Sequence, residues 1–189
     1  YGSAVLFWVV VAAATGVALF EYFRMACPWL GGSRLALSLL ACALPVLAAV
    51  TGRGDVVLAA MIASLLVIVA LALHGYGVVE DVHRYLSCSG FATVYVGLCV
   101  AHVVLLRLHP QGPYWLTMLV AIVAGSDTGA YYAGRAFGRR KLFPQISPKK
   151  TVAGGVGGLV AGIMAAEGLN LLFPTPVNPL LLFVAAAVL

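Results

Sequence analysis

The residues that could carry chemistry gather between Ser126 and Gly158, in the stretch SDTGAYYAGRAFGRRKLFPQISPKKTVAGGVGG. This stretch holds six of the eleven basic residues of the chain, which are Arg135, Arg139, Arg140, Lys141, Lys149 and Lys150. Lysine and arginine side chains, together with the hydroxyls of Ser147 and Thr151, supply the charge and the short-reach donors that a phosphate group needs. The pattern predicts a phosphate-binding loop. The alternative is a basic loop that contacts lipid headgroups without specificity.

The local order of residues adds detail to this loop. Ser147 and Pro148 predict a turn. Lys150 and Thr151 open the apolar run that follows, and the backbone amides at the N-terminus of a helix attract anions. We therefore expect Lys150, Lys141 and Arg135 to hold phosphate, with hydrogen bonds from Ser147 and Thr151.

One carboxylate, Asp127, lies inside an apolar run shortly before the basic loop. A helical rise of 1.5 Å per residue places it on the order of 9 Å below the membrane surface. A carboxylate at that depth costs roughly 2.5–3.5 kcal/mol, so it is expected to face a protein interior or a wet cavity. Ser126 and Thr128 flank it, and Tyr131 lies one helical turn further on the same face. A structural pairing with a neighbouring helix is the alternative, but the adjoining cationic loop favours a functional site.

The composition of the chain indicates which class of protein positions these residues. Of 189 residues, 63% are hydrophobic and 9% are charged, with a mean hydropathy of +1.06. Soluble domains carry about 25% charged residues, so this composition indicates an integral membrane protein. Most of the net charge of +5 lies in one loop between apolar runs, which favours a topology signal and an anion site over nucleic-acid binding.

Apolar runs long enough to cross a bilayer recur along the chain. They predict an all-α fold, a polytopic transmembrane helical bundle with about six complete helices and a truncated seventh. The predicted helices cover residues 2–20, 35–50, 56–73, 91–106, 114–133 and 152–173, and the seventh runs to Leu189. We expect residues 1–189 to form a single transmembrane domain. His74 to Gly90 forms a polar island, predicted as a short interfacial helix or a loop.

Small residues recur at every fourth position in the fifth and sixth predicted helices. The first set is Gly125, Gly129 and Ala133, and the second is Gly154, Gly158 and Gly162. Stripes of this kind allow helix backbones to approach closely, so the two helices are predicted to pack against each other.

Basic residues also orient the chain in the membrane. If the loop of residues 135–150 is cytoplasmic, alternation leaves nine Lys and Arg residues inside and only Arg53 and Arg107 outside. The nine are the six of the loop together with Arg24, Arg34 and Arg84. This distribution obeys the positive-inside rule and predicts a multi-pass protein, expected in the cell inner membrane, with residues 135–150 in the cytoplasm.

Other polar residues give weaker signals. Glu167 lies deep in the sixth predicted helix and is either a second functional carboxylate or a paired structural one. Glu21 and the Glu80–Asp81 pair lie at predicted interfaces, where solvated faces are the usual case. The four cysteines (Cys27, Cys42, Cys88 and Cys99) show no metal-ligand spacing and are interpreted as small apolar residues.

The ordered string from Ser126 to Thr151, followed by a glycine-rich helix, resembles the phosphatidate cytidylyltransferases. The similarity extends over more than thirty positions with fixed spacing, and Glu21–Tyr22 resembles an acidic-aromatic pair of that family. Val152 and Ala153 depart from the family pattern, which often has a tryptophan and then an acidic or amide residue there. The C-terminal signature of the family would lie beyond Leu189, so we expect this chain to be a fragment that lacks it.

The resemblance implies a nucleotidyltransferase that joins CTP and phosphatidate into CDP-diacylglycerol and pyrophosphate, in phospholipid biosynthesis. It implies Mg²⁺ as cofactor and Asp127 as a metal ligand or as an orienting group. Asp127 and Lys150 are then the expected catalytic residues. Substrate-binding residues would be Ser126, Thr128, Tyr131, Arg135, Lys141, Ser147 and Thr151. CTP, phosphatidate and membrane lipid are the expected partners, nucleic acid is not, and a homodimer is left open.

A different class of function is also compatible with the residues alone. In a transporter or channel, Asp127 and Glu167 would line a polar path and the basic loop would only set the topology. This alternative predicts that Lys→Ala changes in the loop leave transport unchanged.

Overall fold

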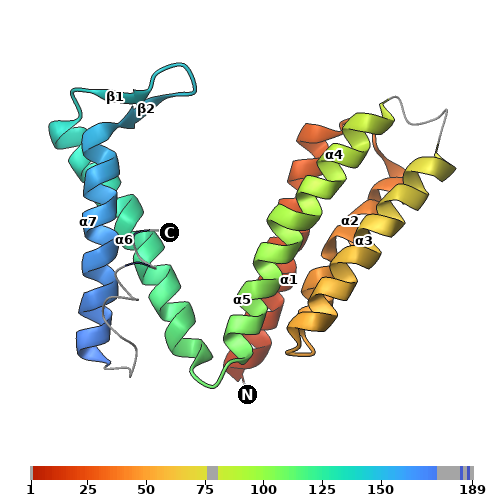
Figure 1. Cartoon of the computed structure of the whole chain (residues 1–189), viewed down its shortest axis with the longest axis horizontal. Helices are drawn as coiled ribbons and strands as arrows, with labels where there is room; N and C mark the ends of the chain where they lie inside the picture. Colours follow the sequence, from red (N-terminus) through yellow and green to blue (C-terminus); the bar gives the residue numbers. More distant parts are fainter. Residues whose placement is uncertain (1, 76–80, 174–183, 185–186, 188–189) are drawn as a thin grey trace. The chain divides into compact units, whose positions relative to one another are not determined.

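The computed structural model describes residues 2–75, 81–173, 184 and 187, and divides the chain into two compact units (Figure 1). The first unit, Tyr1–Pro110, contains α1 (Gly2–Ala26), α2 (Gly32–Ala49), α3 (Gly54–His74), α4 (Val82–Ala92), η1 (Thr93–Leu98) and α5 (Cys99–Leu108). The second unit, Gln111–Leu189, contains α6 (Gly112–Phe137), β1 (Lys141–Phe143), β2 (Ser147–Thr151) and α7 (Val152–Leu172). The predicted all-α class is confirmed. The single domain stays a prediction.

Five helical segments in the described residues are long and apolar enough to cross a membrane. They are Val5–Ala26, Gly32–Ala49, Gly54–His74, the continuous segment Val82–Leu108 and Val152–Leu172. The chain is therefore part of an integral membrane protein. Helix α6 has 26 residues, which is sufficient length, but it is not among these segments. The polar and small residues from Gly125 to Arg135 lower its hydropathy, and five of them (Ser126, Asp127, Thr128, Tyr131 and Arg135) belong to the predicted site.

The fourth spanning segment begins earlier than its apolar run. The prediction placed residues 74–90 in a short interfacial helix or loop, whereas α4 begins at Val82 and continues through η1 and α5 to Leu108. Asp81 caps this helix, because its side chain accepts a hydrogen bond of 2.9 Å from the backbone amide of Arg84. Glu80 and most of the predicted seventh run lie outside the described residues.

The first unit packs its helices with small residues and hydroxyls. A Cβ atom on Gly97 of η1 would lie 2.5 Å from the carbonyl oxygen of Cys42 and 3.5 Å from Cγ of Pro45. Glycine therefore lets the π-helical segment approach α2 where Pro45 interrupts the hydrogen-bond ladder of that helix.

Buried hydroxyls of this unit bond across helix boundaries. Ser38 on α2 and Tyr85 on α4 lie 2.8 Å apart, and Ser64 on α3 lies 3.1 Å from Thr93 on η1. Because these hydroxyls bond to each other within the bundle, they help to hold the helices together.

Two cation–π contacts define the ends of the first unit. The Arg84 guanidinium lies 4.7 Å from the ring centre of Trp29, so the start of α4 shares an end with the α1–α2 connection. Arg107 lies 5.8 Å from the ring centre of Phe7, at the opposite end of α1. Within this unit, the arrangement agrees with the predicted grouping of Arg24, Arg34 and Arg84 on one side.

Cysteines of the first unit serve in packing. Cys27 and Cys42 are buried in the core, and all four cysteines are free thiols. Burial raises the pKa of the Cys27 thiol to about 12, so this group stays protonated at neutral pH. These observations agree with the interpretation of Cys27 and Cys42 as small apolar residues.

Candidate functional site

The second unit is built on a close pairing of α6 and α7. A Cβ atom on Gly129 would lie 2.6 Å from the carbonyl oxygen of Gly157, and one on Gly125 would lie 3.0 Å from Cβ of Ala165. Any side chain at Gly129 would therefore collide with α7. The predicted packing of these two helices against each other is confirmed. On α7, however, Gly125 and Gly129 meet Gly157, Ala161 and Ala165 instead of the predicted stripe of Gly154, Gly158 and Gly162.

The stripe of α7 meets α6 along a second line. Gly154, Gly158 and Gly162 are all buried. A Cβ atom on Gly158 would lie 3.1 Å from the carbonyl oxygen of Ser126, and one on Gly154 would lie 3.0 Å from the carbonyl oxygen of Ala130. These close contacts bring the polar face of α6 next to the first turn of α7.

A β-hairpin closes the end of this helix pair. Strand β1 pairs antiparallel with β2, with Lys141 opposite Thr151 and Phe143 opposite Ser147. The turn lies at residues 143–146, where the amide of Ile146 donates to the carbonyl oxygen of Phe143 at 3.2 Å. The predicted turn at Ser147–Pro148 is therefore wrong, since both residues belong to β2. The turn propensity of two adjacent residues does not take account of pairing between the two strands, and this pairing decides the conformation.

Thr151 joins the hairpin to α7. Its hydroxyl accepts a hydrogen bond of 3.1 Å from the backbone amide of Gly154, and its side chain is 7% exposed. The backbone amide of Val152 donates to the carbonyl oxygen of Arg140 at 3.0 Å. Thr151 thus caps α7 and fixes the position of the two lysines that precede it.

On α6, Tyr131 and Arg135 lie one helical turn apart and interact. The Arg135 guanidinium donates a hydrogen bond of 3.2 Å to the Tyr131 hydroxyl. The rings of Tyr131 and Tyr132 meet edge to face, with their centres 5.3 Å apart. The contact with Tyr131 holds Arg135 over the face of α6 that carries Asp127.

These elements enclose a cavity of about 620 Å³ at the junction of α6, the hairpin and α7. The charged and polar side chains that line it are Asp127, Tyr131, Arg135, Lys141, Lys149, Lys150 and Thr151. Leu142 and small residues of α6 and α7 complete the lining. Four cations and one carboxylate give a formal charge of +3 (4 − 1), so the cavity favours an anion with several charges.

The predicted site residues divide into two groups. Asp127, Tyr131, Arg135, Lys141, Lys150 and Thr151 line the cavity together. Ser126, Thr128 and Ser147 do not. Ser126 lies against α7, where its Oγ is 3.2 Å from the position of a Cβ on Gly158. Thr128 is exposed on α6, and Ser147 is half-buried in β2.

Lys149 lines the cavity although the predicted site did not include it. Its signal in the sequence was its position beside Lys150 within the basic loop. Glu167, the second carboxylate considered for function, is not among the residues that line the cavity.

The charged groups of the cavity are available for a ligand. Among the described residues, the one ion pair joins Arg53 to Asp55 in the first unit, so Asp127 and the four cavity cations form none. No group of three or more metal-ligating side chains occurs among those residues either. Asp127 is thus a single carboxylate facing a group of cations, an arrangement suited to phosphate esters and a cation that they help to bind.

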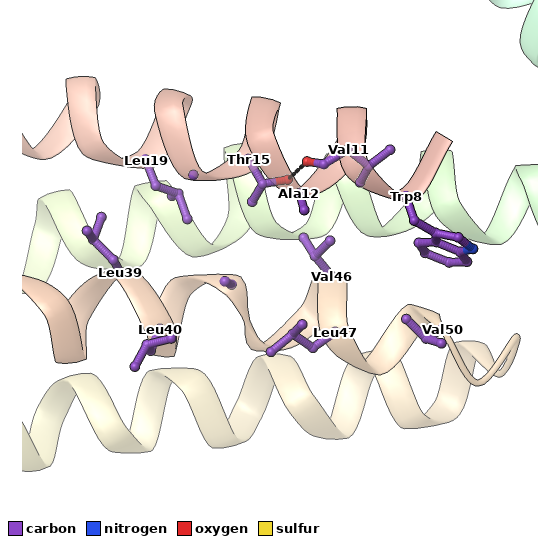
Figure 2. Close-up of a pocket in the computed structure, with 12 residues that line it drawn as sticks. Trp8, Val11, Ala12, Thr15, Leu19, Leu39, Leu40, Val46, Leu47 and Val50 are labelled. Carbon is purple, nitrogen blue, oxygen red and sulfur yellow. Dashed lines mark hydrogen bonds between the residues drawn. The ribbon is translucent and has the colours of Figure 1, made fainter. Parts of the chain in front are cut away.

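The first unit contains a groove of a different kind (Figure 2). Its volume is about 260 Å³, and apolar side chains of α1 and α2 line it, including Trp8, Leu19 and Val46. Thr15 also borders it, but its hydroxyl donates to the carbonyl oxygen of Val11 at 2.7 Å. Its described lining has no charged side chain.

Comparisons with known proteins give one family and several relatives. The model of the Cytidylyltransferase family matches residues 1–189. A phosphatidate cytidylyltransferase of Bacillus subtilis (strain 168) is 34% identical over 87 residues, which are 46% of this chain and 32% of that protein. The enzyme of the same name from Chlamydia pneumoniae is 39% identical over 90 residues, 44% of this chain and 28% of that protein. That of Aquifex aeolicus (strain VF5) is 42% identical over 74 residues, 39% of this chain and 28% of that protein.

The matched segments thus span about a third or less of the length of these curated relatives. No solved structure matches this chain.

Proposed function

The chain belongs to the Cytidylyltransferase family, and from this premise we propose that the full-length protein is a phosphatidate cytidylyltransferase. It would transfer CMP from CTP to phosphatidate and release CDP-diacylglycerol and pyrophosphate. The observation that carries the proposal is the cationic cavity of the second unit. Both substrates are phosphate esters, and the cavity combines four cations with the free carboxylate of Asp127.

The cavity adjoins a helix that spans the membrane, which suits a reaction between a lipid and a soluble nucleotide. Helix α7 begins at Val152, directly after the two cavity lysines Lys149 and Lys150. Cations at this level can meet the phosphate of a membrane lipid while the nucleotide arrives from water. We expect this side to be the cytoplasm, because the basic loop obeys the positive-inside rule.

In the proposed reaction, a phosphate oxygen of phosphatidate attacks the α-phosphorus of CTP. A new P–O bond forms there, and the bond to the bridging oxygen of the β-phosphate breaks, so that pyrophosphate leaves with the electron pair. Lys141, Lys149 and Lys150 would hold the phosphates and balance their charge, and Arg135 would add a fork of donors kept in place by Tyr131. Ser126, Thr128 and Ser147 remain proposed substrate-binding residues that would need to contact substrate outside the cavity lining.

Mg²⁺ fits this set of residues. It is usually bound by one or two carboxylates together with substrate phosphates, and Asp127 is the carboxylate that the cavity supplies. When bound, the ion would neutralise charge that develops on the phosphates. Asp127 itself would orient the nearby cations and set the position of the phosphate groups.

The test is pyrophosphate release by the purified full-length protein in detergent, with CTP, phosphatidate and Mg²⁺. Release should require both substrates. Lys150→Ala and Asp127→Asn should lower kcat/KM, because a hydrogen bond to a charged group contributes about 1.5–3 kcal/mol, or roughly tenfold to a hundredfold.

Two matched variants control for charge and folding. Arg139 is an exposed cation of the same loop that does not line the cavity, so Arg139→Ala should retain activity. Asp55→Asn removes a carboxylate of the first unit and should also retain it. No release from a folded, full-length protein would overturn the proposed function. Equal losses of activity in the two control variants would show that the cavity residues have no specific role in the reaction.

A further inference from the structure

The β-hairpin carries large apolar side chains that the described residues of the second unit leave exposed. Leu142 is 41% exposed, Phe143 is 58% exposed and Ile146 is 85% exposed. We call these three residues the apolar tip. The hairpin lies outside the five segments that can span a membrane, so this exposure differs from that of lipid-facing side chains along the helices.

The geometry of the turn keeps two of these side chains together. The amide of Ile146 donates to the carbonyl oxygen of Phe143 at 3.2 Å, which closes a tight turn through Pro144 and Gln145. Phe143 and Ile146 therefore stand at the two ends of one turn. An aromatic and a branched aliphatic side chain at this position form an exposed apolar patch, and such patches mark contacts with another molecule or with a membrane.

Basic residues surround the apolar tip. Arg139, Arg140 and Lys141 precede it, and Lys149 and Lys150 follow it. All five are exposed, and the described hairpin has no acidic residue from Arg139 to Thr151. Apolar side chains within a group of cations match the boundary of a bilayer, where acyl chains lie next to anionic headgroups.

The place of the hairpin fits the same boundary. It is joined directly to the first residue of the spanning helix α7, and the amide of Val152 donates to the carbonyl oxygen of Arg140 at 3.0 Å. In Figure 1 the hairpin extends sideways from the ends of α6 and α7 instead of continuing along the direction of the helices. This direction suits a hairpin that lies along the membrane surface.

We propose that the apolar tip inserts into the headgroup–acyl boundary of the membrane and anchors the hairpin there. The partner is the lipid surface itself, recognised by apolar burial of Leu142, Phe143 and Ile146 and by the positive charge around them. The anchor would set the height of the cavity lysines relative to lipid phosphates. Leu142 also lines the cavity, whereas Phe143 and Ile146 do not, so these two residues test the anchor apart from the proposed reaction.

Site-directed spin labelling tests the proposal. A nitroxide is placed at Ile146→Cys in the full-length protein after its native cysteines, Cys27, Cys42, Cys88 and Cys99 included, are replaced by alanine. The protein is reconstituted in vesicles of phosphatidylcholine and phosphatidylglycerol. Collisions of the nitroxide are then measured with oxygen, which concentrates among acyl chains, and with a nickel chelate, which stays in water. Arg139→Cys is the matched control, because it is exposed in the same loop but lies outside the apolar tip.

At Ile146 we expect a loss of nickel collisions and a gain of oxygen collisions relative to Arg139. Frequent nickel collisions at Ile146, as high as those at Arg139, would place the tip in water and overturn the proposal. Low collision rates with both reagents at Ile146 would show that a protein segment covers the tip, which would also overturn it. If the Ile146 variant fails to fold, Phe143→Cys gives the same reading from the other end of the turn.

Discussion

The two units use polar residues in opposite ways. In the first unit, buried hydroxyls such as Ser64 and Thr93 bond to each other across helices. In the second, α6 and α7 meet through glycines and alanines, and most charged side chains lie on the cavity instead of between the helices. The difference indicates that hydroxyl pairs help to hold the first unit together, whereas close backbone contact in the second unit leaves the charged side chains of the cavity on its surface for a ligand.

The largest effect should come from filling the α6–α7 seam. Gly129→Leu would drive a side chain into the carbonyl oxygen of Gly157, which lies 2.6 Å from the position of a Cβ on Gly129. Overpacking of this kind costs about 3 kcal/mol, and backbone contact leaves little room to relax. Thermal unfolding in detergent should show a strong loss of stability together with loss of CTP binding. Gly168→Ala on α7 is the control, since nothing lies within 4 Å of a Cβ there. An equal loss of stability in this variant would contradict the claim that close packing at the α6–α7 seam causes the effect.

A smaller effect is expected at the helix cap. Thr151→Val removes the hydroxyl that accepts from the Gly154 amide, which should cost about 1 kcal/mol of stability. Because the cap also places Lys149 and Lys150, substrate KM should rise as well. Thr151→Ser keeps the acceptor and should restore both properties. If serine fails to restore the KM, the cap does not position the lysines.

In the first unit, Ser64→Ala should lower stability by about 0.6 kcal/mol, the average for hydrogen bonds between membrane helices. The partner hydroxyl of Thr93 still donates to the carbonyl oxygen of Ser89 at 3.0 Å, which limits the loss. Unfolding and turnover are measured on the same preparation. Turnover should be unchanged. A fall in kcat for a stable Ser64→Ala protein would show that hydroxyls of the first unit also affect activity.

The smallest effect is expected at the surface. Arg53 donates to Asp55 through Nε at 3.1 Å, but both side chains are about two-thirds exposed, at 67% and 65%. Exposed pairs of this kind are weak because water and salt screen them. Arg53→Ala should leave the melting temperature and the activity unchanged, as measured by thermal unfolding and pyrophosphate release. A clear drop in melting temperature would show that this turn matters more than its exposure indicates.

Hydropathy alone predicted most helices, because a membrane segment must satisfy its backbone groups internally and therefore forms long apolar helices. The small-residue stripes likewise predicted the α6–α7 seam. The start of α4 at Val82 was not predicted, since it depends on a cap by Asp81 instead of on apolarity. The hairpin was missed because its strands have only three and five residues, and only pairing between Lys141 and Thr151 reveals them.

Part of the candidate site followed from residue types. Asp127 and the loop cations were found because charge is rare in this chain and these residues stand close together in sequence. Ser126 and Thr128 were included as neighbours of Asp127, but successive residues of a helix point about 100° apart. That rotation turns Ser126 towards the glycines of α7 and takes both residues off the cavity lining.

The most direct test of the account is CTP binding by the full-length protein in lipid nanodiscs, without phosphatidate, so that turnover does not interfere. The account predicts that Lys150→Ala weakens CTP binding roughly tenfold or more, because a charged hydrogen bond to phosphate is lost. It also predicts that Ser64→Ala in the first unit leaves the Kd unchanged. Unaltered CTP binding in a folded Lys150→Ala protein would contradict the assignment of the cavity as the nucleotide site.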